Sequence, residues 1–274
     1  MSYNKAILIT GASSGIGRAI AEYLSSKGFK IYAGARKNED LDALNKLDNI
    51  TAVRLDVTNQ KEINSVYNFV KSQNTGLFGL VNNAGIAYAG PLMDMPVDFM
   101  YKQFDVNLIG VHRITKTFFP FLLQSKGRII MISSDSGFFA TPFFGPYSAS
   151  KFALEGYSDS LRRELLLVGV KVIIIEPGRI KTPIWDKGKE LFDKFPEDSI
   201  FSEKARKIGE YAIEKGKTSG LSPYKVAKVV YKALTRKKPK LRYLIAPNKF
   251  EYKIIKIMTD KMVDAMVKKK LEKF

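Results

Sequence analysis

The chain of 274 residues contains no cysteine, which excludes disulfide bonds, thiol catalysis and zinc sites built on cysteine. Its single histidine, His112, has no second histidine to share a metal ion, so we interpret it as structural and predict no metal site. No apolar run approaches the roughly 18 residues of a membrane span. The first ten residues also lack the basic and apolar regions of a signal peptide. We therefore expect a cytoplasmic protein.

Acidic residues are scarce relative to basic ones, and the formal net charge is +18. The imbalance is greatest in residues 225–274, which hold 16 Lys and Arg but 4 Asp and Glu. Such a segment can bind nucleic acid or an anionic membrane surface, or can simply be solvated. Because no helix-turn-helix, zinc or RNA-binding signature is present, we do not expect a nucleic-acid partner. The solvated interpretation is the one we favour.

What the chain does contain is a regular alternation of short Ile- and Val-rich runs with amphipathic helical patterns. This alternation predicts an α/β fold of the Rossmann type, a doubly wound parallel sheet of about seven strands with helices on both faces. No linker or repeat divides the chain, so we expect a single domain over residues 1–274. The predicted strands are residues 6–10, 30–34, 50–55, 79–82, 128–133, 170–175 and 242–246. The clearest predicted helices are residues 15–27, 60–73, 99–124 and 147–168.

The turn after the first predicted strand is rich in glycine, with the spacing G-x3-G-x-G. Glycine allows a tight turn and lets the backbone approach a pyrophosphate closely, and the following helix directs its N-terminal dipole at the phosphates. An ordinary strand-to-helix turn is the alternative. The position of this loop at the first strand–helix junction favours a dinucleotide site. The predicted cofactor-binding residues of this loop are Gly11, Ser13, Ser14, Gly15, Ile16 and Gly17.

The end of the second predicted strand carries Arg36 and no acid. An acid there would bind the ribose hydroxyls of NAD, whereas a guanidinium suits the 2′-phosphate of NADP. We therefore predict NADP(H), with Arg36 on the phosphate and Ser13 as a further candidate. A solvated Arg36 is the alternative.

Tyr147 and Lys151 stand four residues apart, so on a helix they share one face. A nearby ammonium lowers the pKa of a phenol, and such a pair can act as a general acid and base. The pattern is common on surface helices, but two further residues favour chemistry. Ser134 follows the fifth strand, where its hydroxyl can stabilise charge that develops on a substrate oxygen. Asn107 lies within a predicted helix, where asparagine is locally unfavourable.

Taken together, these motifs resemble those of the classical short-chain dehydrogenase/reductase family over about residues 4–185. The resemblance implies a tetrad in which Tyr147 is the acid/base, Lys151 binds the nicotinamide ribose, Ser134 positions the carbonyl and Asn107 supports a proton relay. It favours Ser134 over its neighbours Ser133 and Ser136. It also implies homodimers or homotetramers. The further cofactor-binding residues that it implies are Asp56, Val57, Asn83, Ala84, Gly85, Tyr147, Lys151, Pro177, Gly178, Ile180 and Thr182.

Two aromatic stretches flank the expected reaction centre, so we predict a lipophilic substrate. They are residues 138–144 and the substrate loop region 182–222, with Ile184, Trp185, Leu191, Phe192, Phe195 and Phe201. About half of these side chains could instead be core. The stretch 145–164 resembles the hydroxysteroid and retinol dehydrogenase branch, which suggests a steroid, retinoid or acyl-chain alcohol or ketone. A reductase of small carbonyl compounds and a non-catalytic NADP(H)-binding protein are the alternatives.

The basic tail, residues 248–274, predicts an amphipathic C-terminal helix with apolar residues at helical spacing. Three interpretations remain open. The helix packs on the domain or on an oligomer partner, which we favour; it covers the substrate cleft; or it makes a peripheral contact with an anionic membrane.

Overall fold

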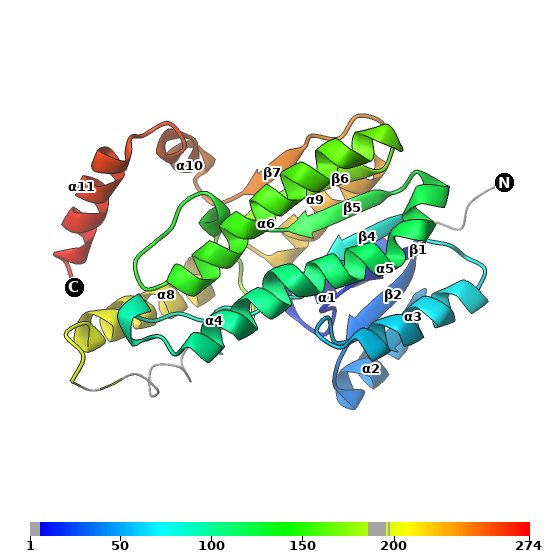
Figure 1. The fold of residues 1–274 in the computed structure, drawn as a ribbon, viewed down its shortest axis with the longest axis horizontal. Coiled ribbons are helices and arrows are strands. Elements are labelled where there is room, and N and C mark those ends of the chain that lie inside the picture. The colour runs from blue at the N-terminus through cyan, green and yellow to red at the C-terminus, as the bar shows by residue number, and fades with distance from the viewer. Residues whose placement is uncertain (1–5, 186–195, 197) are drawn as a thin grey trace.

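The protein, described from a computed structural model over residues 6–185, 196 and 198–274, is built around one seven-stranded parallel sheet (Figure 1). The strand order is β3-β2-β1-β4-β5-β6-β7, which confirms the predicted fold class. The strands are rich in Ile and Val, and most of their residues are buried because helices cover both faces. They are β1 (Ala6–Ile9), β2 (Lys30–Ala35), β3 (Ile50–Arg54), β4 (Gly79–Asn82), β5 (Arg128–Ile132), β6 (Lys171–Pro177) and β7 (Arg242–Ile245).

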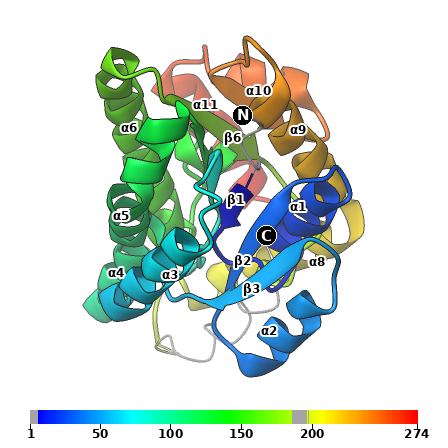
Figure 2. The same ribbon diagram turned by 90° about the vertical axis from the view of Figure 1, so that its right-hand side faces the viewer.

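Alternate residues of each strand pack into two separate apolar cores. Ile7 and Ile9 of β1 face α1 (Gly15–Ser25), α2 (Asn38–Asn45) and α9 (Pro223–Thr235). Leu8 faces the opposite core, which is formed with α3 (Gln60–Ser72), α5 (Gly110–Ser125) and α6 (Gly145–Glu164). Figure 2 shows α3, α5 and α6 on one side of the sheet and α1 and α9 on the other. The sheet is therefore doubly wound.

The predicted helix over residues 99–124 is correct in place but not continuous. It consists of α4 (Val97–Phe104), a π-helical turn over Asp105–Ile109, and α5. The π turn inserts one extra residue into the helical hydrogen-bonding pattern, and such turns occur often at functional sites. Asn107, the asparagine singled out in the sequence, lies at the centre of this turn.

The prediction of one C-terminal helix is wrong, because the tail forms two. These are α10 (Lys249–Ile255) and α11 (Asp260–Leu271), separated at Thr259, whose backbone is extended. Together with α8 (Ser202–Ser219) they lie near the end of the sheet to which the strands point (Figure 1). α11 has no buried residue, whereas α10 buries Ile255. Among the described helices, none is long and apolar enough to cross a bilayer.

The strand order reverses between β1 and β4, and in such sheets ligands bind beyond the C-terminal ends of the strands at this switch point. The loops after β1 and β4 are joined there. Thr10 donates its N–H to the carbonyl of Val81 over 3.0 Å, and its Oγ1 accepts the N–H groups of Asn83 and Ala84, each over 3.0 Å. The predicted site residues follow these and the neighbouring strands, so the fold collects them along one edge.

Candidate active site

The glycine-rich loop folds as a tight turn in contact with the segment after β4. Gly11 and Gly15 have φ angles of +64° and +56°, in the left-handed region that favours glycine. A side chain on Gly11 would lie 2.8 Å from Cα of Ala84, and one on Gly17 would overlap the carbonyl oxygen of Gly11. The loop therefore keeps its backbone exposed as a cradle at the N-terminus of α1, a geometry that suits a phosphate group.

One side chain and one backbone hydrogen bond hold this cradle in place. Asn83 donates from Nδ2 to the carbonyl oxygens of Thr10 and Gly11, each over 2.9 Å. Ser14 is exposed at the N-cap of α1, and its side chain makes no capping hydrogen bond. Ala12 donates its N–H to the carbonyl oxygen of Gly34 over 2.8 Å, which ties the loop to β2. Ser13 and Ile16 are partly buried in the same loop.

Arg36 and Asp56 lie side by side beyond β2 and β3. Nη1 of Arg36 is 3.5 Å from Oδ2 of Asp56, and the arginine side chain is 64% exposed. Burial would raise the pKa of Asp56, but the hydrogen bonds from Thr58 and the charge of Arg36 outweigh it, so the pKa is lowered. Arg54, which the sequence analysis missed, donates to the carbonyl oxygen of Arg36 over 2.6 Å. The guanidinium groups of Arg36 and Arg54 therefore both lie at the ends of β2 and β3.

The remaining predicted cofactor residues border the same edge. Thr182 lies against Gly15, Val57 packs on Gly110, and Gly85 lies against Asn107. Pro177 ends β6, and Gly178 donates its N–H to Ile245 over 2.9 Å. Ile180 is buried and accepts the indole N–H of Trp185 over 2.7 Å. Arg36 and Asp56 lie at the β2–β3 end of this edge, and the other residues lie between β1 and β6.

Ser134 and Tyr147 face each other, the first at the end of β5 and the second in the first turn of α6. The Ser134 hydroxyl hydrogen-bonds Tyr147 and also donates to Oδ1 of Asp135 over 2.9 Å. Burial raises the pKa of Tyr147 to about 12, which the Ser134 hydrogen bond only partly offsets. The phenol is therefore protonated at neutral pH. Ser136 contributes only its backbone N–H, to Ser134 Oγ, and Ser133 packs near Gly137.

Lys151 lies one helical turn beyond Tyr147 and is buried. Its Nζ donates to the carbonyl oxygen of Ile132 over 2.9 Å and lies 5.6 Å from the centre of the Tyr147 ring. Burial lowers the pKa of Lys151 to about 8, against the opposing effect of Glu155. The ammonium is thus charged at neutral pH close to the phenol, as the spacing of the two residues predicts.

Asn107 does not touch Lys151 but reaches the same helix through Ser150. Its Nδ2 donates to Ser150 Oγ over 3.1 Å and to the carbonyl oxygen of Ile86 over 3.0 Å, while its Oδ1 accepts the N–H of Ile86 over 2.9 Å. Gln103, which the sequence analysis missed, is fully buried and bonds the carbonyl oxygen of Ile86 and the N–H of Tyr88, each over 2.7 Å. The two amides fix the chain after β4.

Several of the aromatic residues assigned to a substrate lining make other contacts. Phe138 packs edge-on against Tyr252, Phe143 lies beside Phe201, and Trp185 packs over Gly216 of α8. Through these contacts, the rings help to attach α8 and α10 to the edge of the sheet. Leu191, Phe192 and Phe195 lie outside the described residues.

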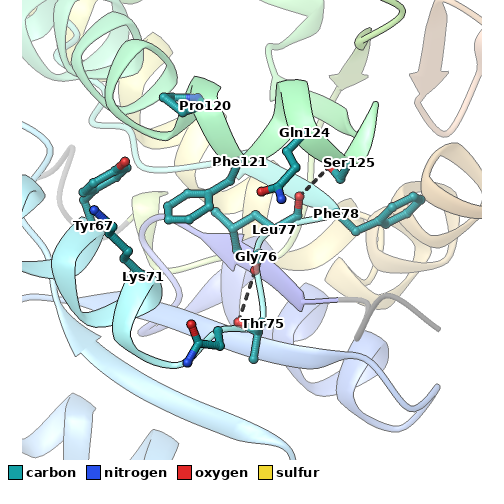
Figure 3. A pocket seen from close by; sticks show the side chains of 11 residues that line it. Tyr67, Lys71, Thr75, Gly76, Leu77, Phe78, Pro120, Phe121, Gln124 and Ser125 are labelled. Carbon is teal, nitrogen blue, oxygen red and sulfur yellow. Dashed lines mark hydrogen bonds between the residues drawn. The ribbon is translucent and has the colours of Figure 1, made fainter. Parts of the chain in front are cut away.

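His112 contacts Tyr157, with 3.2 Å between Nδ1 and the phenol oxygen. In the described part of the chain, no three His, Asp or Glu side chains cluster as metal ligands. A hollow of about 410 Å³ lies elsewhere, between the C-terminal ends of α3 and α5 and the loop before β4 (Figure 3). It is lined by residues such as Tyr67, Phe121 and Phe78 and contains none of the predicted site residues.

Comparison with known proteins agrees with this geometry. Residues 5–190 match the short chain dehydrogenase family, so the chain belongs to this oxidoreductase family. The chain is 35% identical to the NADPH-dependent 3-dehydrocapnine reductase of Ornithobacterium rhinotracheale, over 97% of each chain. It is 36% identical to the mitochondrial D-beta-hydroxybutyrate dehydrogenase of Rattus norvegicus, over 87% of this chain and 76% of that one. A short-chain dehydrogenase from Streptomyces avermitilis superimposes with a TM-score of 0.81 at 28% identity, covering 98% and 96% of the two chains.

Proposed function

We propose that this protein is an NADPH-dependent oxidoreductase that interconverts a ketone or aldehyde with its alcohol on a lipophilic substrate. The observation that carries the proposal is the group formed by the buried Ser134 and Lys151 and the partly exposed Tyr147, beside a glycine cradle for a dinucleotide. A protein that only bound the cofactor would not need a phenol and an ammonium held together in this way. We therefore place the non-catalytic alternative second.

The cofactor fits the residues present, because Gly11 and Gly17 let the loop pack closely on Ala84 and Asn83 while the N-terminus of α1 has no side-chain cap and can bind a pyrophosphate. When bound, NADPH supplies the hydride. The loop from Gly11 to Gly17 would bind the phosphates, and Asn83, Ala84 and Gly85 would line the ribose. Asp56 and Val57 would border the adenine, and Pro177, Gly178, Ile180 and Thr182 the nicotinamide.

The tetrad residues then have distinct roles. Tyr147, protonated at neutral pH, gives its proton to the substrate oxygen, and Lys151 stabilises the phenolate that forms. Ser134 orients the substrate oxygen. Asn107 holds the loop at Ile86 and the helix at Ser150, and so maintains the distance between them. The protonated phenol is the form that donates a proton in the reductive direction.

Arg36 supports NADPH over NADH, since the end of β2 carries a guanidinium and no acid. The relative from Ornithobacterium rhinotracheale is described as NADPH-dependent, which agrees with this choice. The lipophilic substrate rests on the aromatic residues 138–144 and on Trp185 and Phe201. A steroid, a retinoid or an acyl chain meets that description; a reductase of small carbonyl compounds is the second candidate.

Assembly and location belong to the same proposal. Large apolar side chains are exposed on α4, α6 and the turn between α4 and α5, among them Tyr101, Ile109 and Phe152. We therefore propose a homodimer or homotetramer that covers these faces in the cytoplasm, with residues 1–274 as one catalytic domain. Light scattering on the purified protein tests the oligomer, and a monomeric mass would contradict it.

The first experiment follows NADPH and NADH absorbance with steroid, retinoid, long-chain and small ketones and aldehydes. Tyr147→Phe removes the proton donor and keeps the ring, so turnover should fall by about 10²–10⁴-fold. Tyr157→Phe, on the same helix but against His112, should leave turnover unchanged. Equal rates in the wild type and Tyr147→Phe would refute the assignment of the acid.

A further inference from the structure

The carboxylate of Asp135 lies directly behind Ser134. The Ser134 hydroxyl donates its one proton to Oδ1 of Asp135 over 2.9 Å, and its oxygen accepts the N–H of Ser136 over 3.1 Å. Asp135 therefore determines how Ser134 points toward Tyr147 and the substrate. None of the roles derived above for the tetrad includes this carboxylate.

Asp135 in turn has a partner from the far end of the chain, the phenol of Tyr252 on α10. The two groups hydrogen-bond, and they converge over Gly178, where a methyl group would lie 3.1 Å from Oδ2 of Asp135 and 3.5 Å from Oη of Tyr252. Burial raises the pKa of Asp135, and the hydrogen bonds from Tyr252, Ser134 and Ser136 and the charge of Arg179 oppose that rise. Tyr252 thus favours the ionised carboxylate.

α10 is itself fixed against the end of the sheet. Nζ of Lys256, just beyond the helix, lies 3.1 Å from Oε1 of the buried Glu176 on β6 and 3.8 Å from the centre of the Phe138 ring. The Phe138 ring meets the Tyr252 ring edge-on, with 6.2 Å between their centres. The position of Tyr252 is therefore set by an ion pair to the buried Glu176 and by two ring contacts.

We propose that Asp135 and Tyr252 are positioning residues that orient Ser134 for the reaction, so that α10 completes the catalytic centre. This inference rests on the proposed reductase function. In the resting site Asp135 accepts from Tyr252 and Ser134 together and holds the serine side chain in place, and in the reaction the Ser134 proton turns to the substrate oxygen. Without the Tyr252 hydroxyl, the Asp135 carboxylate loses one of its donors and holds the Ser134 proton more firmly, away from the substrate oxygen.

The kinetic test compares Tyr252→Phe and Asp135→Asn with the wild type. Each should lower kcat about 10–100-fold, because small misplacements of reacting groups have effects of this size. The KM for NADPH should change less than kcat, because neither variant alters the Gly11–Gly17 loop or Arg36, the groups proposed to bind the phosphates. Phe250→Ala, at an exposed position on the same helix, should behave as the wild type. A Tyr252→Phe variant with wild-type kcat would overturn the inference.

A second readout does not depend on turnover. Carbon-13 NMR of protein labelled at the aspartate carboxyls gives the titration of Asp135, assigned from the resonance that Asp135→Asn removes. The midpoint should be higher in Tyr252→Phe than in the wild type, and an unchanged midpoint would overturn the inference while leaving the reductase proposal intact. Conversely, a wild type that turns over no carbonyl compound would overturn the reductase proposal and the positioning role with it.

Discussion

At the scale of single residues, the proposed reduction requires the charge of one buried lysine. Burial lowers the pKa of Lys151 to about 8 and raises that of Tyr147 to about 12. Between these values the phenol still carries its proton, but the ammonium that would stabilise the phenolate has lost its charge. We therefore expect NADPH-dependent reduction to be fastest below about pH 8 and to fall about tenfold as pH rises through that value. Initial rates at saturating cofactor test this, and a rate that increases through pH 8 would contradict it.

The choice of cofactor also belongs to single residues. Replacing the exposed Arg36 with Asp removes the group that we propose binds a 2′-phosphate and adds a repelling charge beside Asp56. The KM for NADPH should rise about 10–100-fold, with NADH much less affected. Lys46→Gln removes a positive charge at the end of α2, away from the site, and serves as the control. An unchanged preference would show that Arg36 is only a solvated residue.

The sequence is informative about residues whose partners are near in the chain. Tyr147 and Lys151 share a helix face because they are four residues apart, and Gly11, Gly15 and Gly17 form one turn. Asp135, Gln103 and Tyr252 could not be identified in the same way. Their importance comes from contacts between distant segments, and no local spacing reveals that Tyr252 on α10 meets Asp135 beyond β5.

At the scale of secondary structure, the π turn between α4 and α5 is the element that depends most on one side chain. Asn107 satisfies both backbone groups of Ile86 and bonds Ser150. Asn107→Ala leaves the N–H of Ile86 without its partner and removes one hydrogen bond each from the Ile86 carbonyl and Ser150, which should lower the free energy of unfolding by about 1–3 kcal/mol. Urea unfolding measures this. Asn64→Ala, exposed on α3, should change the free energy by no more than about 0.5 kcal/mol, and equal effects of the two variants would contradict this role for Asn107.

Elements differ in how far their own sequence defines them. The seven strands are short apolar runs, most of whose residues are buried, so hydrophobicity alone located them within one or two residues of the observed ends. The π turn could not be predicted, because its extra residue reflects contacts of Asn107 with Ile86 and Ser150 across the fold. The break at Thr259 was also missed, since apolar residues continue at helical spacing on both sides of it.

At the scale of the whole molecule, the two C-terminal helices are attached to the protein very differently. α10 buries Ile255 and contacts Asp135, Glu176 and Phe138, whereas α11 buries no residue. Near the C-terminal end of α11, the centre of the Phe274 ring lies 5.3 Å from that of Tyr211 on α8. Lys270 lies over the same Tyr211 ring. The first helix is therefore expected to support catalysis, and the second to be dispensable for it.

Two truncations test this division. Ending the chain after Thr259 removes α11 and should lower the melting temperature by less than about 4 °C, with kcat unchanged, because little buried surface is lost. Ending it after Asn248 removes Tyr252 and Lys256 as well and should lower kcat at least about tenfold. A higher KM for the lipophilic substrate in the chain that ends after Thr259 would mean that α11 covers the cleft. Loss of binding to anionic vesicles by that truncation, with KM unchanged, would assign α11 to a membrane surface, since its exposed Met262 and Met266 lie on a helix that ends in three lysines.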